Sequence, residues 1–395
     1  MPEIYIGLMS GTSLDGVDGV LVDFSGTVPA VLHHSYSPFA PSLSQELLAL
    51  NTGGADELHR AALAANALVR VYAGVVSDLL TKTGIGRSDV TAIGAHGQTV
   101  RHRPQEFGTG YTLQLNNPAL LAELSGIDVV ADFRSRDVAA GGQGAPLVPA
   151  FHQAVFGRTD EAVAVLNIGG ISNITILIPA SVNALTDAQG VLDVLGEVTG
   201  FDCGPGNALM DHWCQKHTGQ AFDAGGSWAA SGRVNERLLR ILLDEPYFAK
   251  PPPKSTGRDL FNVPWLMAKL AAVEAETPPD PARPMDRLRP VDVQATLTEL
   301  TASACASCVL SYGKQSNSLI VCGGGAFNMH LMRRIQARLP GLSVVSSKAR
   351  GLPPMQVEAA AFAWLARKAI RRETASLPKV TGAKGTRIVG AIYPA

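Results

Sequence analysis

The sequence predicts an α/β protein built from two similar domains, and three observations support this. Strand-like and helical patterns alternate along the chain, which is typical of α/β proteins. The 395 residues suffice for two domains, or three, at roughly 100–200 residues each. Two hairpins of one design occur in successive halves: an apolar strand, a tip of Gly, Ser, Thr or Asn, and a second apolar strand. This pattern suggests a duplicated domain.

The first half begins with the first of these hairpins. Residues 4–8 form a short apolar run, and residues 17–24 alternate in hydrophobicity as a half-buried strand does. Helical periodicity then extends over 45–80. Apolar runs at 89–95 and 127–133 predict two further strands.

The second half starts with the second hairpin, whose strands we expect at 162–168 and 174–178. A helix is predicted over 292–310 and a closing helix over 358–372, with a strand at 318–321 between them. Helices and strands therefore alternate here as well.

Three features mark connections and ends of elements. Proline clusters at 251–253 and 278–290 indicate connectors or surface loops. Asp292, just after the second cluster, is a candidate helix N-cap. Residues 373–395 show no clear helical face, and we expect them to be loosely ordered.

Composition argues against several classes of protein. Lys and Arg total 33 against 34 Asp and Glu, a net charge of -1, so nothing favours binding along a nucleic-acid backbone. No apolar run approaches the ~18 residues of a membrane span. The N-terminus lacks the basic and apolar regions of a signal peptide. We therefore expect a cytoplasmic protein with neither nucleic-acid nor membrane partners.

The cysteines indicate a reducing compartment. They number five and their spacing is irregular, so they do not form a disulfide framework. Cys305 and Cys308 make a lone CxxC within a helical pattern, whereas a zinc site needs about four ligands. We interpret both as buried helix residues.

The tip of the first hairpin is the first candidate functional segment. Backbone amides and hydroxyls at a glycine turn can surround phosphate oxygens. Asp15 and Asp18 could hold a hydrated Mg²⁺, whose ligands are oxygens. An ordinary hairpin turn capped by Ser and Thr is the alternative. The segment comprises Gly11, Thr12, Ser13, Leu14, Asp15, Gly16, Val17 and Asp18.

Two further glycine-rich segments lie in the second half. Asp202 stands between a strand and a helical pattern, where it could act as a general base beside a phosphate or simply cap the helix. Gly323, Gly324 and Gly325 follow a strand and would let the backbone lie flat against a planar ring or a phosphate. Their spacing is neither a Rossmann nor a Walker motif.

A polar turn follows the strand predicted at 89–95. His96, Gln98 and Thr99 could bind the hydroxyls of a sugar, and a hydrogen-bonded structural histidine is the alternative. His96 and His102 are not four residues apart, which disfavours a metal site on a helix.

An arginine pair precedes a second glycine-rich loop. Arg134 and Arg136 suit a carboxylate or a phosphate, because a guanidinium offers two parallel donors. Pairing with nearby acids such as Asp137 on the surface is the alternative. The chain holds neither a GxSxG elbow nor an HExxH motif, so a serine hydrolase or a zinc protease is disfavoured.

Taken together, these segments resemble the anhydro-N-acetylmuramic acid kinases, bacterial sugar kinases with an actin/hexokinase-like fold. Each segment alone is weakly specific, but nine in order are highly specific. They are IGLMSGTSLDGVD, GAHGQTVRH, ADFRSRDVAAGGQGAPL, LNIGGISN, FDCGPGNALMD, PPPKSTGRDLFN, DVQATLTELTA, VCGGGAFN and VEAAAFAWLA.

The resemblance implies a fold and an assembly. The chain would form two RNase H-like domains of the actin/hexokinase type around a central cleft. Residues 1–145 would form the N-terminal domain, with the region of about 358–395 packing back on it, and 146–357 the C-terminal one. The family also leads us to expect a homodimer.

The resemblance implies an ATP- and Mg²⁺-dependent reaction as well. Water would open the anhydro ring of 1,6-anhydro-N-acetylmuramic acid, and the freed 6-oxygen would be phosphorylated during peptidoglycan recycling. Asp202 would be the general base, and Asp18 would hold Mg²⁺ through water. The ATP residues would be 11–18, Gly169, Gly170, Gly323, Gly324 and Gly325; the sugar residues would be His96, Gln98, Thr99, Arg134, Arg136, Asp137 and Glu358.

One position departs from the family pattern, and two other functions stay open. An acid is common three residues before Glu358, where this chain has Met355, which puts that acid's contribution in doubt. Glu358 could alternatively be a helix N-terminal acid stabilised by the dipole. The chain could instead phosphorylate another amino sugar or a polyol, or be a non-catalytic actin-like binding protein. The presence of Asp202 argues against the last.

Overall fold

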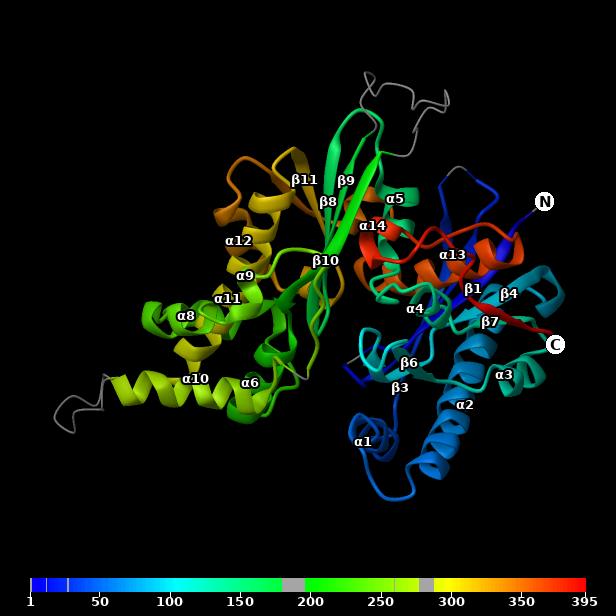
Figure 1. The fold of residues 1–395 in the computed structure, drawn as a ribbon, viewed down its shortest axis with the longest axis horizontal. Helices are drawn as coiled ribbons and strands as arrows, with labels where there is room; N and C mark the ends of the chain where they lie inside the picture. The colour runs from blue at the N-terminus through cyan, green and yellow to red at the C-terminus, as the bar shows by residue number, and fades with distance from the viewer. Residues whose placement is uncertain (1, 12, 27, 180–195, 259, 277–287) are drawn as a thin grey trace. The chain divides into compact units, whose positions relative to one another are not determined.

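The computed structural model describes residues 2–395 except 12, 27, 180–195, 259 and 277–287. The described chain separates into two compact units (Figure 1). The first comprises Met1–Val155 and Met355–Ala395, and the second comprises Phe156–Pro354.

The first unit is built on a six-stranded sheet with the order β13-β7-β4-β1-β2-β3. β1, β2 and β3 form an antiparallel meander, and β4 runs parallel to β1. A separate hairpin of β5 and β6 stands beside it. The strands are β1 (Ile4–Met9), β2 (Gly16–Asp23), β3 (Ala30–Pro38), β4 (Val90–Ala95), β5 (Gln98–Arg103), β6 (Tyr111–Leu115), β7 (Val129–Ala131) and β13 (Ala391–Tyr393).

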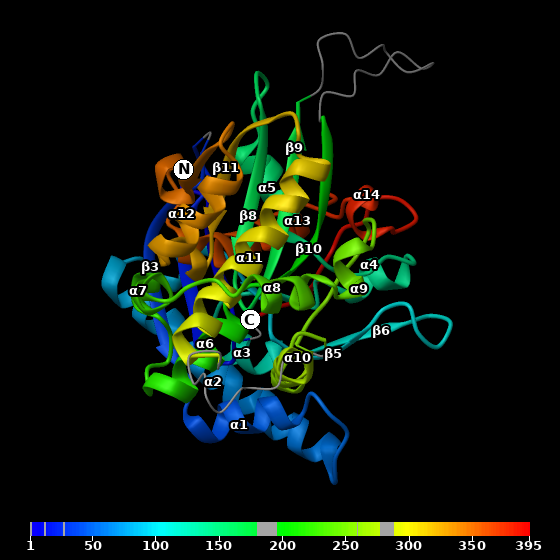
Figure 2. The same cartoon turned by 90° about the vertical axis from the view of Figure 1, so that its left-hand side faces the viewer.

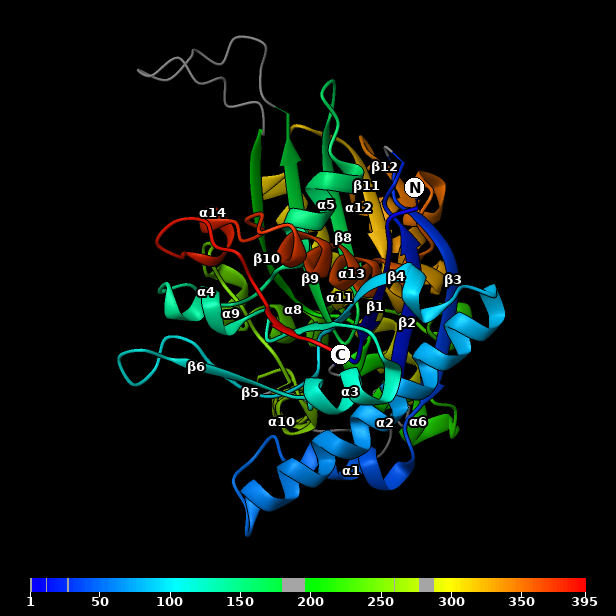
Figure 3. The same cartoon turned by 90° about the vertical axis from the view of Figure 1, so that its right-hand side faces the viewer.

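Helices of this unit cover the sheet through apolar residues. α2 contacts β2 and β3, and α13 lies against β1 and β4 (Figure 3). Nearly every residue of α13 from 357 to 366 is buried, and a helix that is apolar on all sides is expected in a core. The helices are α1 (Pro41–Ala49), α2 (Glu57–Thr83), α3 (Pro118–Ser125), α4 (Ser135–Ala139), α5 (Val148–Phe156, ending at the unit boundary), α13 (Val357–Ile370) and α14 (Pro378–Thr381).

The second unit repeats the same sheet plan with the order β10-β9-β8-β11-β12. β8, β9 and β10 again form an antiparallel meander, while β11 runs parallel to β8 and β12 to β11. This shared order is the RNase H-like arrangement, so the predicted α/β class and its two RNase H-like domains are confirmed. The strands are β8 (Ala162–Ile168), β9 (Ile171–Ile178), β10 (Glu197–Pro205), β11 (Ser316–Cys322) and β12 (Ser343–Ser346).

The long helix α11 (Pro290–Tyr312) is the centre of the second unit, and it packs against β9 and β10 (Figure 2). Most of its residues are buried, including hydroxyl side chains. Thr298 and Ser303 donate to the carbonyls four residues before them, so burial leaves these hydroxyls satisfied. The other helices are α6 (Ala208–Thr218), α7 (Ser227–Ser231), α8 (Glu236–Leu243), α9 (Pro246–Ala249), α10 (Val263–Glu276) and α12 (Met329–Arg338).

The structure refines one sequence expectation and corrects another. The helical periodicity over 45–80 belongs to two helices, and Gly53 and Gly54 lie in the break between α1 and α2. Asp292 is not the N-cap of α11, which starts two residues earlier at Pro290. It instead accepts from the Arg233 amide at 2.8 Å and pairs with Arg289.

The expectation of a loosely ordered end at 373–395 is wrong. Its residues form α14 and then β13, which pairs antiparallel with β7. The Ala395 amide also donates to Asp128 at 3.0 Å. A three-residue strand has too little sequence pattern to be found locally, and its partner lies over 250 residues away. The prolines expected at 278–290 fall mostly outside the described residues.

Within the described part of the chain, one helix is long and apolar enough to cross a membrane by length and composition. This helix is α2, with 27 residues. Its buried residues, among them Leu68, Tyr72 and Val76, belong to the core of the first unit. The core helix of a globular domain meets the same criterion, so this finding alone is weak support for a membrane span.

Glycines allow α13 to approach the sheet closely, which gives a stability prediction. A methyl group at Gly7 of β1 would lie 1.8 Å from the Ala359 carbonyl oxygen, whereas one at Gly74 on α2 would meet nothing within 4 Å. We expect Gly7→Ala to lower the free energy of unfolding by about 3 kcal/mol or more, since overpacking typically costs about 1–3 and backbone yields least. Gly74→Ala should raise it by about 0.5–1 kcal/mol. Denaturant melts of both variants test this, and equal midpoints would contradict it.

Candidate functional site

The tip of the first hairpin is a tight turn with its backbone fixed from several sides. Leu14 has a left-handed φ of 58° and donates its amide to the Gly11 carbonyl at 3.3 Å. Its own carbonyl accepts from the Ser44 hydroxyl at 2.8 Å. Thr12 lies outside the described residues. The turn therefore has a defined shape, as a phosphate-binding loop requires.

Both acidic residues of this hairpin contact polar side chains. Ser13 donates to the Asp15 carboxylate at 2.6 Å, and Tyr36 donates to the Asp15 carbonyl at 3.0 Å. Burial, and then the Asp15 and Asp18 carboxylates, raise the pKa of Tyr36 to about 12, so its hydroxyl stays protonated. Asp18 contacts His34 Nε2 at 2.8 Å.

A buried ring of three hydrogen bonds joins the hairpin to the turn after β4. The Gly97 amide donates to Tyr72 Oη at 3.1 Å, and Ser10 Oγ donates to the Gly97 carbonyl at 3.1 Å. Ser10 and Tyr72 lie 3.0 Å apart. Since Ser10 has given its proton to Gly97, Tyr72 must be the donor in that last bond. The ring fixes the end of β1 relative to the His96–Gln98 turn.

Buried His96 and half-buried Arg134 form a pair. Arg134 Nε and Nη2 lie 3.2 and 2.9 Å from His96 Nε2, so the imidazole is the acceptor and is neutral. Burial first, and then the Arg134 charge, lower the pKa of His96 to about 3, with backbone groups of Ser10 and Gly97 opposing. Arg134 also donates to the Gly144 carbonyl at 2.8 Å. The pair thus connects the polar turn to the glycine-rich loop.

The neighbouring predicted sugar residues differ in their surroundings. Gln98 is buried and donates to the Gly11 carbonyl at 3.1 Å, while its Oε1 has no hydrogen-bond partner among the residues described. Thr99 accepts from Gln114 at 3.2 Å. A buried, unpartnered acceptor suits a ligand hydroxyl.

Asp137 and Arg136, neighbours in sequence, lie in different surroundings. Asp137 is fully buried and accepts from the Gly144 amide and the Thr381 hydroxyl, both at 2.8 Å. It therefore anchors the glycine-rich loop rather than pairing with an arginine at the surface. Arg136 is exposed. Glu358 lies in the first turn of α13 and is half-buried.

In the second unit, three glycine-rich segments meet. The Asn207 amide donates to the Gly169 carbonyl at 2.8 Å, and the Gly206 amide donates to the Gly170 carbonyl at 3.0 Å. A methyl group added at Gly324 would lie 3.4 Å from Asn207 Nδ2. Segments predicted separately from the sequence therefore form one cluster of backbone, suited to phosphate or a nucleotide.

Gly323 is one of the close backbone approaches in this cluster. Its φ is +75°, and a methyl group there would lie 2.4 Å from Asn167 Oδ1 and 2.7 Å from the Ile168 carbonyl oxygen. Asn167 Oδ1 is buried without a hydrogen-bond partner among the described residues. Gly325 is held equally closely, against the Ile168 side chain. Any side chain at these positions would push β11 away from β8.

Asp202 lies on β10 beside a bulge. The strand register shifts between Asp202 and Gly204, and bulges commonly redirect a side chain next to an active site. The carboxylate accepts from the Thr256 amide at 2.9 Å. Asp202 does not cap α6, which starts at Ala208 with Asn207 at the N-cap position.

A residue of α11 holds the end of β10 by hydrogen bonds. Thr301 of α11 donates its hydroxyl to the Pro205 and Gly206 carbonyls at 3.1 and 3.2 Å. Cys305 and Cys308 are buried free cysteines on the same helix, as predicted. Burial raises the pKa of the neighbouring Cys203 thiol, which fits a packing role.

The described residues offer no preformed metal cage. No group of three or more His, Cys, Asp or Glu in that part of the chain could hold an ion. Asp15 is exposed and Asp18 is partly so, and each keeps carboxylate lone pairs beyond its one contact. This donor set fits Mg²⁺ bound mainly through water and substrate phosphates, which is how Mg²⁺ is usually held.

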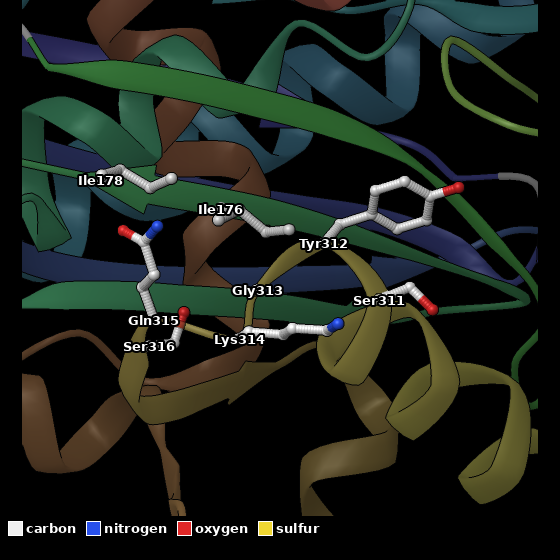
Figure 4. Close-up of a pocket in the computed structure, with 8 residues that line it drawn as sticks. All are labelled: Ile176, Ile178, Ser311, Tyr312, Gly313, Lys314, Gln315 and Ser316. Carbon is white, nitrogen blue, oxygen red and sulfur yellow. The ribbon is translucent and has the colours of Figure 1, made fainter.

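A small pocket elsewhere in the second unit shares no residue with these clusters. Its volume is about 180 Å³, and it lies between Ile176 and Ile178 of β9 and residues 311–316, which run from the end of α11 to the start of β11 (Figure 4). We do not place the reaction there.

Sequence reasoning missed several positioning residues. Tyr72 lies in the middle of a helical pattern, and nothing local marks its hydroxyl as a partner of Gly97. Lys254 and Thr256 stand in the recognised segment PPPKSTGRDLFN, yet no role could be assigned without the contact between Thr256 and Asp202.

Comparison with known proteins gives a consistent result. A family model described as anhydro-N-acetylmuramic acid kinase matches residues 3–395. A protein of that name from Albidiferax ferrireducens is 66% identical, with 100% of both chains covered. One from Variovorax paradoxus is 64% identical over 100% of this chain and 99% of that protein.

Two solved structures are similar at low identity. The activator of the 2-hydroxyisocaproyl-CoA dehydratase from Clostridium difficile, with bound ADPNP, has a TM-score of 0.45 and 13% identity, covering 95% of this chain and 99% of that one. A ROK family glucokinase from Streptomyces griseus, in complex with glucose and AMPPNP, has a TM-score of 0.40 and 13% identity, covering 92% and 99%.

Two buried histidines predict acid sensitivity. Burial lowers the pKa of both His96 and His152 to about 3, against about 6.5 in the unfolded chain. Between these values the unfolded state binds more protons, so stability is full above pH 6.5 and is lost as pH falls. Each histidine contributes a slope of about 1.4 kcal/mol per pH unit. Urea unfolding from pH 7 to 5 measures this dependence of the free energy of unfolding on pH. His152→Leu should lower its slope by the contribution of one histidine, and an unchanged slope would contradict the prediction.

Proposed function

Because the chain belongs to the anhydro-N-acetylmuramic acid kinase family, we propose that it uses ATP to convert 1,6-anhydro-N-acetylmuramic acid into N-acetylmuramic acid 6-phosphate. The family match over residues 3–395 carries this proposal. The second unit supports it with a carboxylate, Asp202, on the strand that leads into the cluster of glycine-rich segments. A base beside an anion-binding backbone is what this chemistry needs.

Asp202 is the general base in this proposal. Its carboxylate takes a proton from a water molecule that attacks the anomeric carbon, and the bond between that carbon and the bridge oxygen breaks. The freed 6-oxygen then attacks the γ-phosphorus of ATP, the bond from that phosphorus to the β,γ-bridging oxygen breaks, and ADP leaves. The Thr256 amide favours the ionised form of Asp202 and fixes its direction, both of which a base requires.

ATP is bound by backbone rather than by a basic surface. The Gly11–Asp18 hairpin of the first unit and Gly169, Gly170 and 323–325 of the second supply backbone amides that donate hydrogen bonds to phosphate or nucleotide oxygens. This agrees with a net charge near zero. Mg²⁺ would neutralise the phosphates when bound, and Asp18 would hold it through water.

The sugar is recognised by groups of the first unit. The buried, unpartnered Oε1 of Gln98 suits a sugar hydroxyl, and Thr99 lies beside it in sequence. Arg134 and Arg136 suit the lactyl carboxylate, and His96, Asp137 and Glu358 complete the set of proposed sugar residues. His96 and Asp137 act mainly by holding Arg134 and its loop in place.

The cellular setting follows from the proposed substrate. An anhydro amino sugar is a product of peptidoglycan turnover, so the reaction belongs to cell-wall recycling. We place the enzyme in the cytoplasm, where ATP is available, and expect it to work as a homodimer.

The substrate assignment predicts a specific product. Incubation with 1,6-anhydro-N-acetylmuramic acid, ATP and Mg²⁺ should give ring-opened N-acetylmuramic acid 6-phosphate and one ADP per sugar, measured by mass spectrometry. N-acetylglucosamine and glycerol serve as comparison substrates. ATP turnover on one of these without product from the anhydro sugar would favour a kinase of another amino sugar or a polyol.

The base assignment predicts the effect of Asp202→Asn. The variant should bind ATP and sugar within about threefold of the wild type, because an amide oxygen can still accept from the Thr256 amide. Its kcat should fall by about 10²–10⁴, the usual contribution of general base catalysis. Glu197→Gln, at the exposed start of the same strand, is the control. Near-normal turnover in Asp202→Asn would refute the role.

A further inference from the structure

A buried lysine lies in the loop that contacts Asp202. Lys254 is only 8% exposed, although ammonium groups are rarely buried without a carboxylate. Its Nζ lies 3.4 Å from the carbonyl oxygens of Tyr247 and Phe248. It also lies 4.8 Å from the centre of the Tyr247 ring and 5.8 Å from that of Phe201. Backbone dipoles and ring faces, rather than a described acid, hold this charge.

The segment that Lys254 holds contacts Asp202 at three atoms. The Asp202 amide donates to the Lys254 carbonyl at 3.2 Å, and the Asp202 carbonyl accepts from Tyr247 Oη at 2.8 Å. The Asp202 carboxylate accepts from the Thr256 amide at 2.9 Å. Lys254 makes one of these contacts itself and lies between Tyr247 and Thr256 in sequence, and its side chain joins α9 to the loop that follows it. Without the ammonium, this side chain would no longer hold the loop against α9.

Other titratable groups lie near Asp202 and Lys254. Burial first, and then the Asp202 carboxylate, raise the pKa of Tyr247, so its phenol stays protonated and can donate. Burial raises the pKa of the Cys203 thiol. The pKa of Cys308 is lowered, first by its hydrogen bond with Cys203 and then by the Lys254 charge. Lys254 is therefore a buried positive charge in the segment that contacts Asp202.

We propose that Lys254 is a positioning residue for the reaction: its buried ammonium fixes the 247–256 segment so that the Thr256 amide meets the Asp202 carboxylate. Lys254 acts through Asp202 and does not touch the substrate. The inference rests on the proposed role of Asp202 as the base. It gives a reason for a charged side chain at a position where an apolar one would be easier to bury.

The test compares three variants. Lys254→Met removes the charge and loosens the loop, and both effects should raise the pKa of Asp202 by about one unit or more. We expect kcat to fall about 10- to 100-fold, KM for ATP to stay within about twofold, and the acid limb of the kcat profile to move to higher pH. Lys254→Arg, which keeps the charge, should leave the acid limb near that of the wild type. Lys250→Met removes an exposed cation 5.9 Å from the same Tyr247 ring and should change neither quantity.

A direct readout separates positioning from simple stability. The carboxyl pKa of Asp202 can be measured by ¹³C NMR on protein labelled at aspartate, assigned by comparison with Asp202→Asn. A folded Lys254→Met with an unchanged Asp202 pKa and an unchanged acid limb would overturn the proposal. If Lys254→Met does not fold, Lys254→Gln replaces it, and the same two results decide.

Failure of the two proposals can be told apart. If Asp202 is not the base, Asp202→Asn keeps its turnover, yet Lys254→Met still raises the carboxyl pKa. If Lys254 has no positioning role, Asp202→Asn is inactive while Lys254→Met behaves like Lys250→Met.

Discussion

Contact between backbone and backbone at a few glycines is the constraint on which this structure depends. In the first unit α13 lies so near β1 and β4 that a methyl group at Gly7 or Gly94 would overlap a helix carbonyl oxygen. In the second unit Gly206 and Gly323 have the same relation to the Gly169 and Ile168 carbonyls. Side chains cannot be accommodated at such distances, so these positions determine how each core closes.

The same close approach of backbone to backbone forms the candidate site. When strands and turns meet without side chains between them, their amides and carbonyls are brought together at the ends of the strands. The cluster around Gly169, Gly206 and Gly324 is an example, because its segments are held by backbone hydrogen bonds. A surface of this kind can accept phosphate with little formal charge. The glycines that allow close packing are therefore also the residues that expose backbone for phosphate binding.

Polar side chains in the two units serve mainly to hold such backbone in place. Tyr72 fixes Gly97, Asp137 fixes Gly144, and Thr301 fixes Gly206. Lys254 fits the same pattern, since its buried charge holds a loop rather than facing solvent. Precise positioning accounts for much of the rate in phosphoryl transfer, where the protein performs little covalent chemistry. A network of this sort is therefore appropriate to the proposed reaction.

The sequence by itself determined the α/β class, the repeated hairpins and the family, because these depend on local periodicity and on segments read in order. It also predicted β8 at its observed bounds and the buried cysteines of α11. Only the tertiary structure decided that 391–393 joins a sheet, that Asp202 stands beside a bulge and not at a helix cap, and that Asp137 is an anchor. Each of these depends on a partner distant in sequence, such as Val129–Ala131, Thr256 or Thr381. The residues adjacent in sequence do not indicate such a distant partner. The role can be assigned only when the folded structure shows the residue in contact with that partner.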